Sequence, residues 1–157
     1  METTRHFTAT VYVVNDGAIA LHDHERLGKR LPPGGHIDRD ELPHEAGLRE
    51  VTEEMGLEPT LLDATEPIKG AGRTLPQPRH TRLYDVNVHD GVVGHQHVDL
   101  IFYATVDSRA IDPAPGETPA SAWSWYDRRA LKTSTLDEDT KTIGCEAIET
   151  ASSDQSS

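Results

Sequence analysis

The chain has 157 residues, of which 27 are acidic and 15 basic, so its formal net charge is −12. This length favours a single domain, and the negative charge disfavours binding to duplex nucleic acid or to an anionic membrane. The one cysteine, Cys145, excludes an intrachain disulfide and a cysteine zinc cluster. The sequence shows no signal-peptide pattern and no apolar run of transmembrane length, so we expect a soluble cytoplasmic protein.

The first half of the chain predicts strands around one strong helix. Residues 7–14 are rich in β-branched and aromatic side chains, which favours a strand. The turn signal at residues 15–17 then leads into a return strand over 18–22, and residues 24–33 form a polar connection. A helix is predicted from Pro43 to Met55, because Pro43 suits its first position and Gly56 suits the residue after its end.

The second half of the chain predicts further strands and a terminal helix. We expect strands at residues 60–65, 81–88, 98–106 and 122–126, loops or turns at 68–78, 89–95 and 107–120, and a helix over 136–150. This order predicts a mixed α+β or layered α/β/α domain, not a regular βαβ series. The domain is expected to span residues 1–150, followed by a disordered tail at 151–157.

The excess of acid also suggests an environment. The chain has abundant Asp and Glu, an apolar fraction of 35%, and few lysines, namely Lys29, Lys69, Lys132 and Lys141. A large negative charge keeps a protein soluble where salt screens its self-repulsion. We interpret this composition as halophilic, typical of a high-salt cytoplasm, and the alternative is an ordinary acidic protein.

The central helix carries a cluster of carboxylates on one face. At about 100° per residue, Glu50, Glu53 and Glu54 fall within one arc, roughly opposite the apolar residues Val51 and Met55. Like charges at these spacings destabilise an isolated helix, and a hard divalent cation such as Mg²⁺ would offset that repulsion. The helix alone therefore predicts either a metal-assisted phosphoryl or pyrophosphoryl site, or simply a solvated acidic face.

A wider pattern surrounds this helix. Gly35 is followed after five residues by Glu41, and after seven more by the segment 49–57, which reads REVTEEMGL. This resembles the Nudix box at all of its defining positions from Gly35 to Leu57, and a chance match is roughly one in a million or rarer. Gly34 precedes the box as is usual in the Nudix hydrolase family, and the segment 125–131 resembles the tryptophan-to-leucine segment near the end of Nudix domains.

The resemblance implies a fold and a metal site. Nudix domains are α/β (α+β) proteins that form an α/β/α sandwich around a mixed β-sheet. Carried onto this chain, Glu53 and Glu54 are the expected metal ligands, and Glu50 is either a ligand or the general base that activates water. The carbonyl of Gly34 is a further candidate ligand. The expected cofactor is Mg²⁺, with Mn²⁺ as a substitute.

Other box residues are expected to support the site. Arg49 resembles the box arginine that pairs with acidic residues and orients them, which places it with Glu50 and Glu53 among the catalytic candidates. Glu41, Gly35 and Gly56 resemble the structural residues of the box. Many family members add an acidic residue from a later loop, and the candidates here are Glu117, Asp99 and Asp85.

Positive side chains are needed to hold substrate phosphates. Arg30 lies just before the box, and Arg79 and Arg82 flank the next predicted strand. These three are the candidate substrate-binding residues because guanidinium groups bind phosphate well. The alternative is that they are solubilising surface charges.

Histidines present a separate ambiguity. His95 and His97 are two residues apart and share one face if that segment is a strand, and His36 follows the paired glycines. Together they could reach a metal pocket. The alternative, which we favour, is a polar strand end and an unrelated loop histidine.

The resemblance predicts a hydrolase that cleaves a pyrophosphate bond in a nucleoside diphosphate linked to another moiety. The candidate small-molecule substrates are ADP-ribose-like dinucleotides, nucleotide sugars, nucleoside triphosphates and dinucleoside polyphosphates, because the scaffold hosts many substrates. A non-catalytic ligand-binding or sensing Nudix module is the alternative. A homodimer is also consistent with the family.

Overall fold

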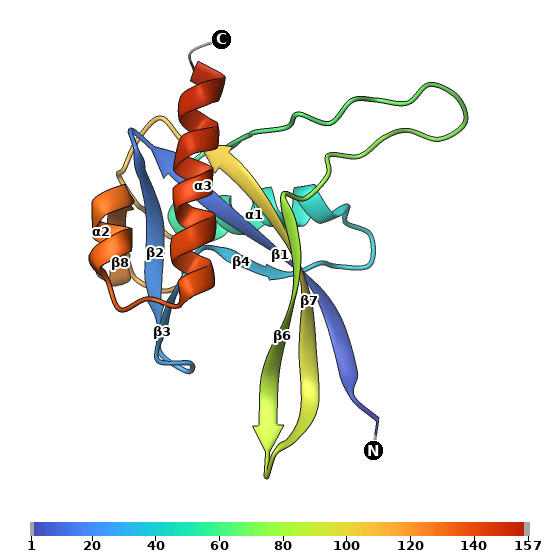
Figure 1. Ribbon diagram of the computed structural model, residues 1–157, viewed down its shortest axis with the longest axis vertical. Coiled ribbons are helices and arrows are strands. Elements are labelled where there is room, and N and C mark those ends of the chain that lie inside the picture. Colours follow the sequence, from blue (N-terminus) through green and yellow to red (C-terminus); the bar gives the residue numbers. More distant parts are fainter. Residues whose placement is uncertain (1, 156–157) are drawn as a thin grey trace.

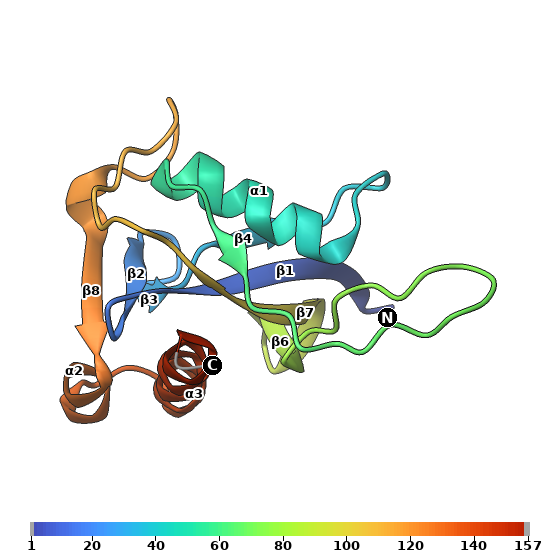
Figure 2. The same cartoon turned by 90° about the horizontal axis from the view of Figure 1, so that it is seen from above.

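One mixed β-sheet forms the centre of the protein, and helices cover both of its faces (Figures 1 and 2). The computed structural model describes residues 2–155, and within them the sheet has eight strands. The strands are β1 (Thr4–Asn15), β2 (Ala18–His24), β3 (Lys29–Leu31), β4 (Gly34–His36), β5 (Thr60–Leu61), β6 (His80–His89), β7 (Val92–Thr105) and β8 (Trp123–Asp127). The helices are α1 (Pro43–Met55), the 3₁₀ helix η1 (Ala120–Ala122), α2 (Arg128–Thr133) and α3 (Glu138–Gln155).

Strand β1 organises the sheet. It pairs in parallel with β7 and antiparallel with β2 and β4. Strands β5 and β6 extend the sheet from β7, and β3 and β8 extend it from β2, all antiparallel. The mixed sheet with helices on both faces confirms the expected α/β/α sandwich.

Two apolar cores lie on the two faces of the sheet. Because side chains alternate along a strand, Val11 and Phe102 pack with α1, whereas Tyr12 and Tyr103 pack with α3. Figure 2 shows α1 on one side of the sheet and α2 and α3 on the other. The box helix therefore occupies one face by itself.

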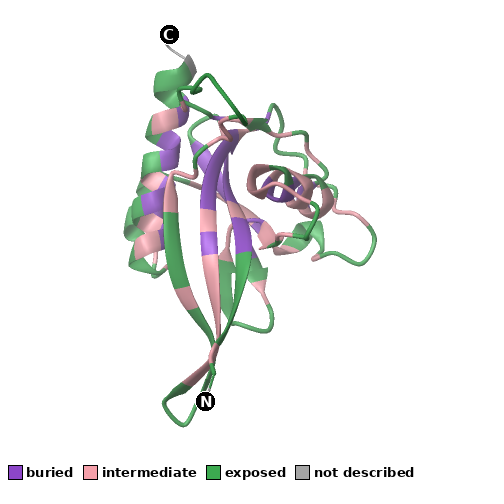
Figure 3. Cartoon of the chain, turned by 90° about the vertical axis from the view of Figure 1, so that its right-hand side faces the viewer, coloured by how far each residue is buried: buried purple, intermediate pink, exposed green. Residues whose placement is uncertain are grey.

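The pairing of β1 with β7 continues beyond the part of the sheet that α1 and α3 cover. Its register is unbroken from Thr4 opposite His95 to Val14 opposite Thr105. Beyond the helices, the lower ends of β1, β6 and β7 project from the body, and their residues are largely exposed or half-buried (Figures 1 and 3). On the sheet face that packs against α3, the side chains of β1 and β7 are apolar under the helix and polar in the projecting part.

The hairpin between β6 and β7 is tighter than predicted. A turn is expected over residues 89–95, but β6 ends at His89 and β7 begins at Val92. Asp90 and Gly91 have φ angles of 51° and 76°, which suit a two-residue hairpin turn. The polar residues that follow therefore belong to a strand, because they pair with both β6 and β1. The turn at Asp16 and Gly17, with φ angles of 44° and 76°, is of the same kind and was expected.

Other boundaries also differ. The polar connection 24–33 contains the short strand β3, and residues 128–133 form the unpredicted helix α2. The sequence predicts a disordered tail from residue 151, but helix α3 continues to Gln155. Ala151 is buried against the core beneath α3, which explains the extra turn. Residues 156–157 of that tail lie outside the described residues. Within the described part of the chain, no helix is long and apolar enough to cross a membrane.

Candidate active site

Helix α1 begins and ends as the sequence predicts. Leu42 precedes it without a side-chain oxygen that could cap the helix, but Glu45 reaches back and accepts a hydrogen bond from the Leu42 N–H at 3.2 Å. At the other end, Gly56 adopts the left-handed conformation with φ 67°. The carboxylate-bearing face is therefore held on a helix with defined ends.

The two glycines before the box lie directly against its carboxylates. The backbone N–H of Gly34 donates to Oε2 of Glu54 at 3.3 Å. A β-carbon on Gly35 would lie 2.5 Å from Oε1 of Glu50, so only glycine allows this approach. Strand β4 reaches this position because it pairs with β1, Thr10 being opposite Gly34.

Arg49 joins three acidic side chains. Its Nε and Nη2 donate to the two oxygens of Glu41 at 2.7 and 3.0 Å, and its Nη1 donates to Glu50 and Glu53 at 3.1 Å each. This is the arrangement expected of the box arginine. The hydrogen bonds to Glu41 are the main reason that the pKa of Arg49 is raised, so it remains a cation.

The pKa values of Glu50 and Glu54 are both raised in the absence of a cation. Burial is the largest cause for each, and the charge of Glu50 helps to raise the pKa of Glu54 to about 9. The two carboxyls are close enough that the charge of one disfavours ionisation of the other. A bound cation would favour the ionised form of both groups, and these oxygen donors fit a divalent metal.

The proline-rich loop brings a further carboxylate towards α1. The backbone N–H groups of Asp112 and Ala114 donate to the carbonyls of Met55 and Glu53 at 2.9 and 2.8 Å. The charge of Glu117, further along this loop, contributes to the raised pKa of Glu54. The structure therefore brings Glu117 towards the carboxylate cluster, as the sequence suggests for the extra acid.

Asp99 and Asp85, the other two candidates for this acid, lie elsewhere. Asp99 is buried on the sheet face opposite α1 and accepts hydrogen bonds from Thr8 and Thr10 at 2.8–2.9 Å. Burial raises the pKa of Asp99 to about 6. Asp85 accepts from Gln96 at 2.8 Å on the projecting hairpin. Neither carboxylate belongs to the cluster on α1.

The structure does not bring the three candidate arginines to this cluster. Arg82 lies 3.6 Å from Asp139 of α3, and Arg79 lies over the ring of Tyr103, also on the α3 face. Arg30 forms an ion pair with Asp23 at 2.8 Å. Their role in holding substrate stays a prediction, and no sequence signal indicated which face they would occupy.

The histidines gather on the same face as Asp99. His36, His95 and His97 lie close together, and the structure adds His6 from β1, which the sequence did not single out. Only the parallel pairing of β1 with β7, which places His6 opposite His97, reveals this fourth member. The histidines lie on the side of the sheet opposite the box carboxylates.

Comparison with known proteins agrees with this fold. A NUDIX domain model matches residues 4–144. A NUDIX-family hydrolase from Clostridium perfringens is 35% identical in sequence, with a TM-score of 0.79 over 93% of this chain and 97% of its own. A MutT protein from Bacillus halodurans, 17% identical, has a TM-score of 0.61 over 91% of this chain and 82% of its own. The fold and the box helix thus define a Nudix domain, and the chain belongs to the NUDIX family.

A curated relative with a different activity is also similar. Isopentenyl-diphosphate Delta-isomerase from Roseobacter denitrificans is 26% identical over 130 residues, which cover 78% of this chain. The match covers 65% of the length of that isomerase. Proteins similar to this chain therefore include both a hydrolase and an isomerase.

Proposed function

We propose that this protein is a Mg²⁺-dependent hydrolase that cleaves a pyrophosphate bond in a nucleoside diphosphate linked to another moiety. The observation that carries the proposal is the partly buried pair Glu50 and Glu54, which lies against Gly34 and Gly35. Two adjacent carboxylates facing open backbone suit a hard cation that also contacts phosphate oxygens. Similarity to a hydrolase of the family supports this reaction class.

The residues of the box have different proposed roles. Glu53, Glu54 and the carbonyl of Gly34 are the proposed metal ligands, with Mn²⁺ as a substitute for Mg²⁺. When bound, the cation neutralises phosphate charge and lowers the pKa of water. Glu50 either binds the metal or accepts the proton of the attacking water, and Arg49 positions it through the 3.1 Å hydrogen bond.

The test is hydrolysis of a panel of pyrophosphates by the purified protein with Mg²⁺ or Mn²⁺. The panel contains ADP-ribose, nucleotide sugars, nucleoside triphosphates and dinucleoside polyphosphates, and products are identified by chromatography. Glu53→Gln and Glu54→Gln should each lower kcat by orders of magnitude, whereas Glu58→Gln, at an exposed position just after α1, should not. Absence of product from the whole panel, or near-normal activity of both box variants, would refute the proposal.

Two other functions are outcomes of the same screen. Isopentenyl diphosphate belongs in the panel because the chain resembles an isomerase of that substrate, and isomerised product without phosphate release would favour that reaction. Ligand binding without turnover would favour a sensing module. The complete set of box carboxylates supports hydrolysis over sensing.

The acidic composition supports a high-salt cytoplasm as the working environment. With a net charge of −12, self-repulsion is relieved when salt screens it. The Tm should therefore rise as KCl is raised to molar concentration, and a falling Tm would contradict this. A homodimer is proposed on family grounds alone, and sedimentation at several concentrations would test it.

A further inference from the structure

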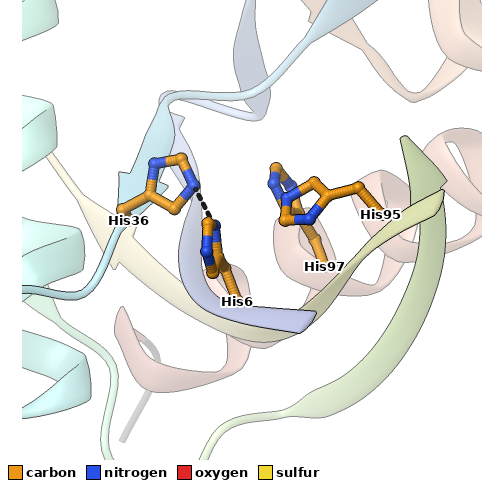
Figure 4. A group of neighbouring side chains, drawn as sticks. All are labelled: His6, His36, His95 and His97. Atoms are coloured by element: carbon orange, nitrogen blue, oxygen red, sulfur yellow. Dashed lines mark hydrogen bonds between the residues drawn. The ribbon is translucent and has the colours of Figure 1, made fainter. Parts of the chain in front are cut away.

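Four histidines from three strands surround one point at the projecting end of the sheet. His6 comes from β1, His36 from β4, and His95 and His97 from β7. One ring nitrogen from each lies within 4.8 Å of the others. Figure 4 shows the four rings turned towards a common centre.

Strand register produces this arrangement. His6 lies opposite His97 in the parallel β1–β7 pair, and His36 lies opposite Thr8 in the antiparallel β1–β4 pair. His95 and His97 are two residues apart on one strand, so they share a face. All four side chains are exposed or half-buried, so ions in solution can reach them.

The spacing of the nitrogens suits a small metal ion. Nδ1 of His6 and Nε2 of His36 are 3.3 Å apart. Four nitrogens bound tetrahedrally at about 2.0–2.1 Å from zinc would be separated by roughly 3.3 Å. Neighbouring rings are close to perpendicular, at 72–90° for the pairs His6–His36, His6–His95, His36–His97 and His95–His97. Rings in this edge-on arrangement can all point a nitrogen at one centre. The other nitrogen–nitrogen distances, which are at most 4.8 Å, would shorten to about 3.3 Å with small side-chain movements.

Thr4 forms a hydrogen bond with the ring of His95 that suits metal binding by this histidine. Its hydroxyl donates to the carbonyl of Gly94 at 3.1 Å and lies 3.0 Å from Nδ1 of His95. When the hydroxyl donates to this carbonyl, its oxygen accepts a hydrogen bond only from the tautomer of His95 that is protonated at Nδ1. The lone pair of His95 is then on Nε2, and a hydrogen bond of this kind is typical of the outer shell of metal sites.

We propose that His6, His36, His95 and His97 form a second metal site, which binds a divalent transition-metal ion of the Zn²⁺ class. Imidazole nitrogen suits such ions, whereas Mg²⁺ prefers the oxygen donors found on α1. Metal binding by these histidines does not require the proposed hydrolysis. The site connects β1, β4 and β7 on the sheet face opposite α1, and so stabilises the start of the box loop.

The two sites are linked through one residue. His36 follows Gly35 in the chain, and its carbonyl accepts a hydrogen bond from Nη2 of Arg49 at 3.4 Å. A metal bound by the His36 ring would therefore also hold the backbone that Arg49 contacts.

The test is Zn²⁺ binding by the full-length protein after removal of metals, in millimolar Mg²⁺ to occupy the carboxylates of α1. Calorimetry should give one Zn²⁺ per chain, and Co²⁺ should give the visible spectrum of a four-coordinate nitrogen site. His6→Asn/His97→Asn should weaken Zn²⁺ binding by at least about a hundredfold, and Thr4→Ala by about tenfold. Zn²⁺ should also raise the Tm of the wild type but not of the double variant.

Two controls make the result decisive. His89→Asn changes an exposed histidine on the same hairpin, and Glu53→Gln/Glu54→Gln removes box carboxylates, and both should retain Zn²⁺ binding. Circular dichroism without metal checks that each variant folds, and His95→Asn replaces the double variant if that one does not. The proposal is overturned if the wild type binds no Zn²⁺ even at a free Zn²⁺ concentration on the order of 100 times the Kd expected for such a site. It is equally overturned if binding survives the histidine changes or depends on the box carboxylates.

Discussion

Gly35 lies so close to Glu50 that a β-carbon on the glycine would be 2.5 Å from Oε1 of the carboxylate. Strand β4 and helix α1 are thus in contact at the point where the proposed chemistry takes place. The nearest obstacle to a larger residue is the end of a side chain, which can move, and not the backbone. Position 35 is therefore a place where function and stability can be separated.

Gly35→Ala should lower kcat by about a hundredfold, because displacing a positioned group by about 1 Å has effects of that size. The free energy of unfolding should change by less than about 1 kcal/mol, since the Glu50 side chain can turn away. Kinetics and urea denaturation measure the two effects. Gly94→Ala is the matched control, because its β-carbon would meet only the Asn87 carbonyl at 3.8 Å. Full activity of Gly35→Ala would show that the close approach has no catalytic role.

Glu41→Gln should destabilise the protein at neutral pH but not in acid. Hydrogen bonds from Arg49 are the main cause that lowers the pKa of Glu41 below its ordinary value of 4.5. The stability from this pair is fully present above pH 4.5, and it is lost as the pH falls through the lower folded-state pKa. At pH 7 the Tm should fall by roughly 2–4 °C. Glu66→Gln, at an exposed loop position, is the control, and an equal effect of Glu41→Gln at all pH values would contradict this account.

Glu54→Gln should raise the Tm of the metal-free protein while abolishing its response to Mg²⁺. Burial and the neighbouring charge of Glu50 disfavour the ionised Glu54 carboxylate, so a neutral amide removes that cost. With Mg²⁺ the order should reverse, because only the wild type gains stability from the ion. Calorimetric scans with chelator and with Mg²⁺ measure both effects, with Glu58→Gln as the control. A metal-free Glu54→Gln protein that melts below the wild type would count against the raised pKa.

Gly56→Ala should destabilise the protein by more than Gly116→Ala. Both glycines have positive φ angles, 67° and 89°, so each alanine costs about 1–2 kcal/mol of backbone strain. At Gly56 the new β-carbon would also lie 2.0 Å from the Asp112 carbonyl, whereas nothing lies within 4 Å at Gly116. Equal losses in urea denaturation would mean that the loop at Asp112 moves freely away from α1.

Local signals determined the box helix. Pro43 and Gly56 mark its ends, and the spacing of Glu50, Glu53 and Glu54 places them on one face. Arg49 is on the same helix, so its hydrogen bonds to Glu50 and Glu53 depend on short separations in sequence. The family followed from this one segment, and the fold class followed from it and from the order of the predicted strands and helices. Both are confirmed by the comparisons.

Long-range pairing determined what lies around that helix. The parallel pairing of β1 with β7 places His6 beside His97 across 91 positions of sequence, and it places Asp99 against Thr8 and Thr10 on the face away from α1. A shift of one residue in register would have reversed those faces, and periodicity within either strand does not specify the register. The sequence by itself therefore determined the carboxylate-bearing helix and its family, because helical contacts are local. Only the tertiary structure decided which arginines face away from the carboxylates and which four histidines meet, because strand partners are chosen across the whole chain.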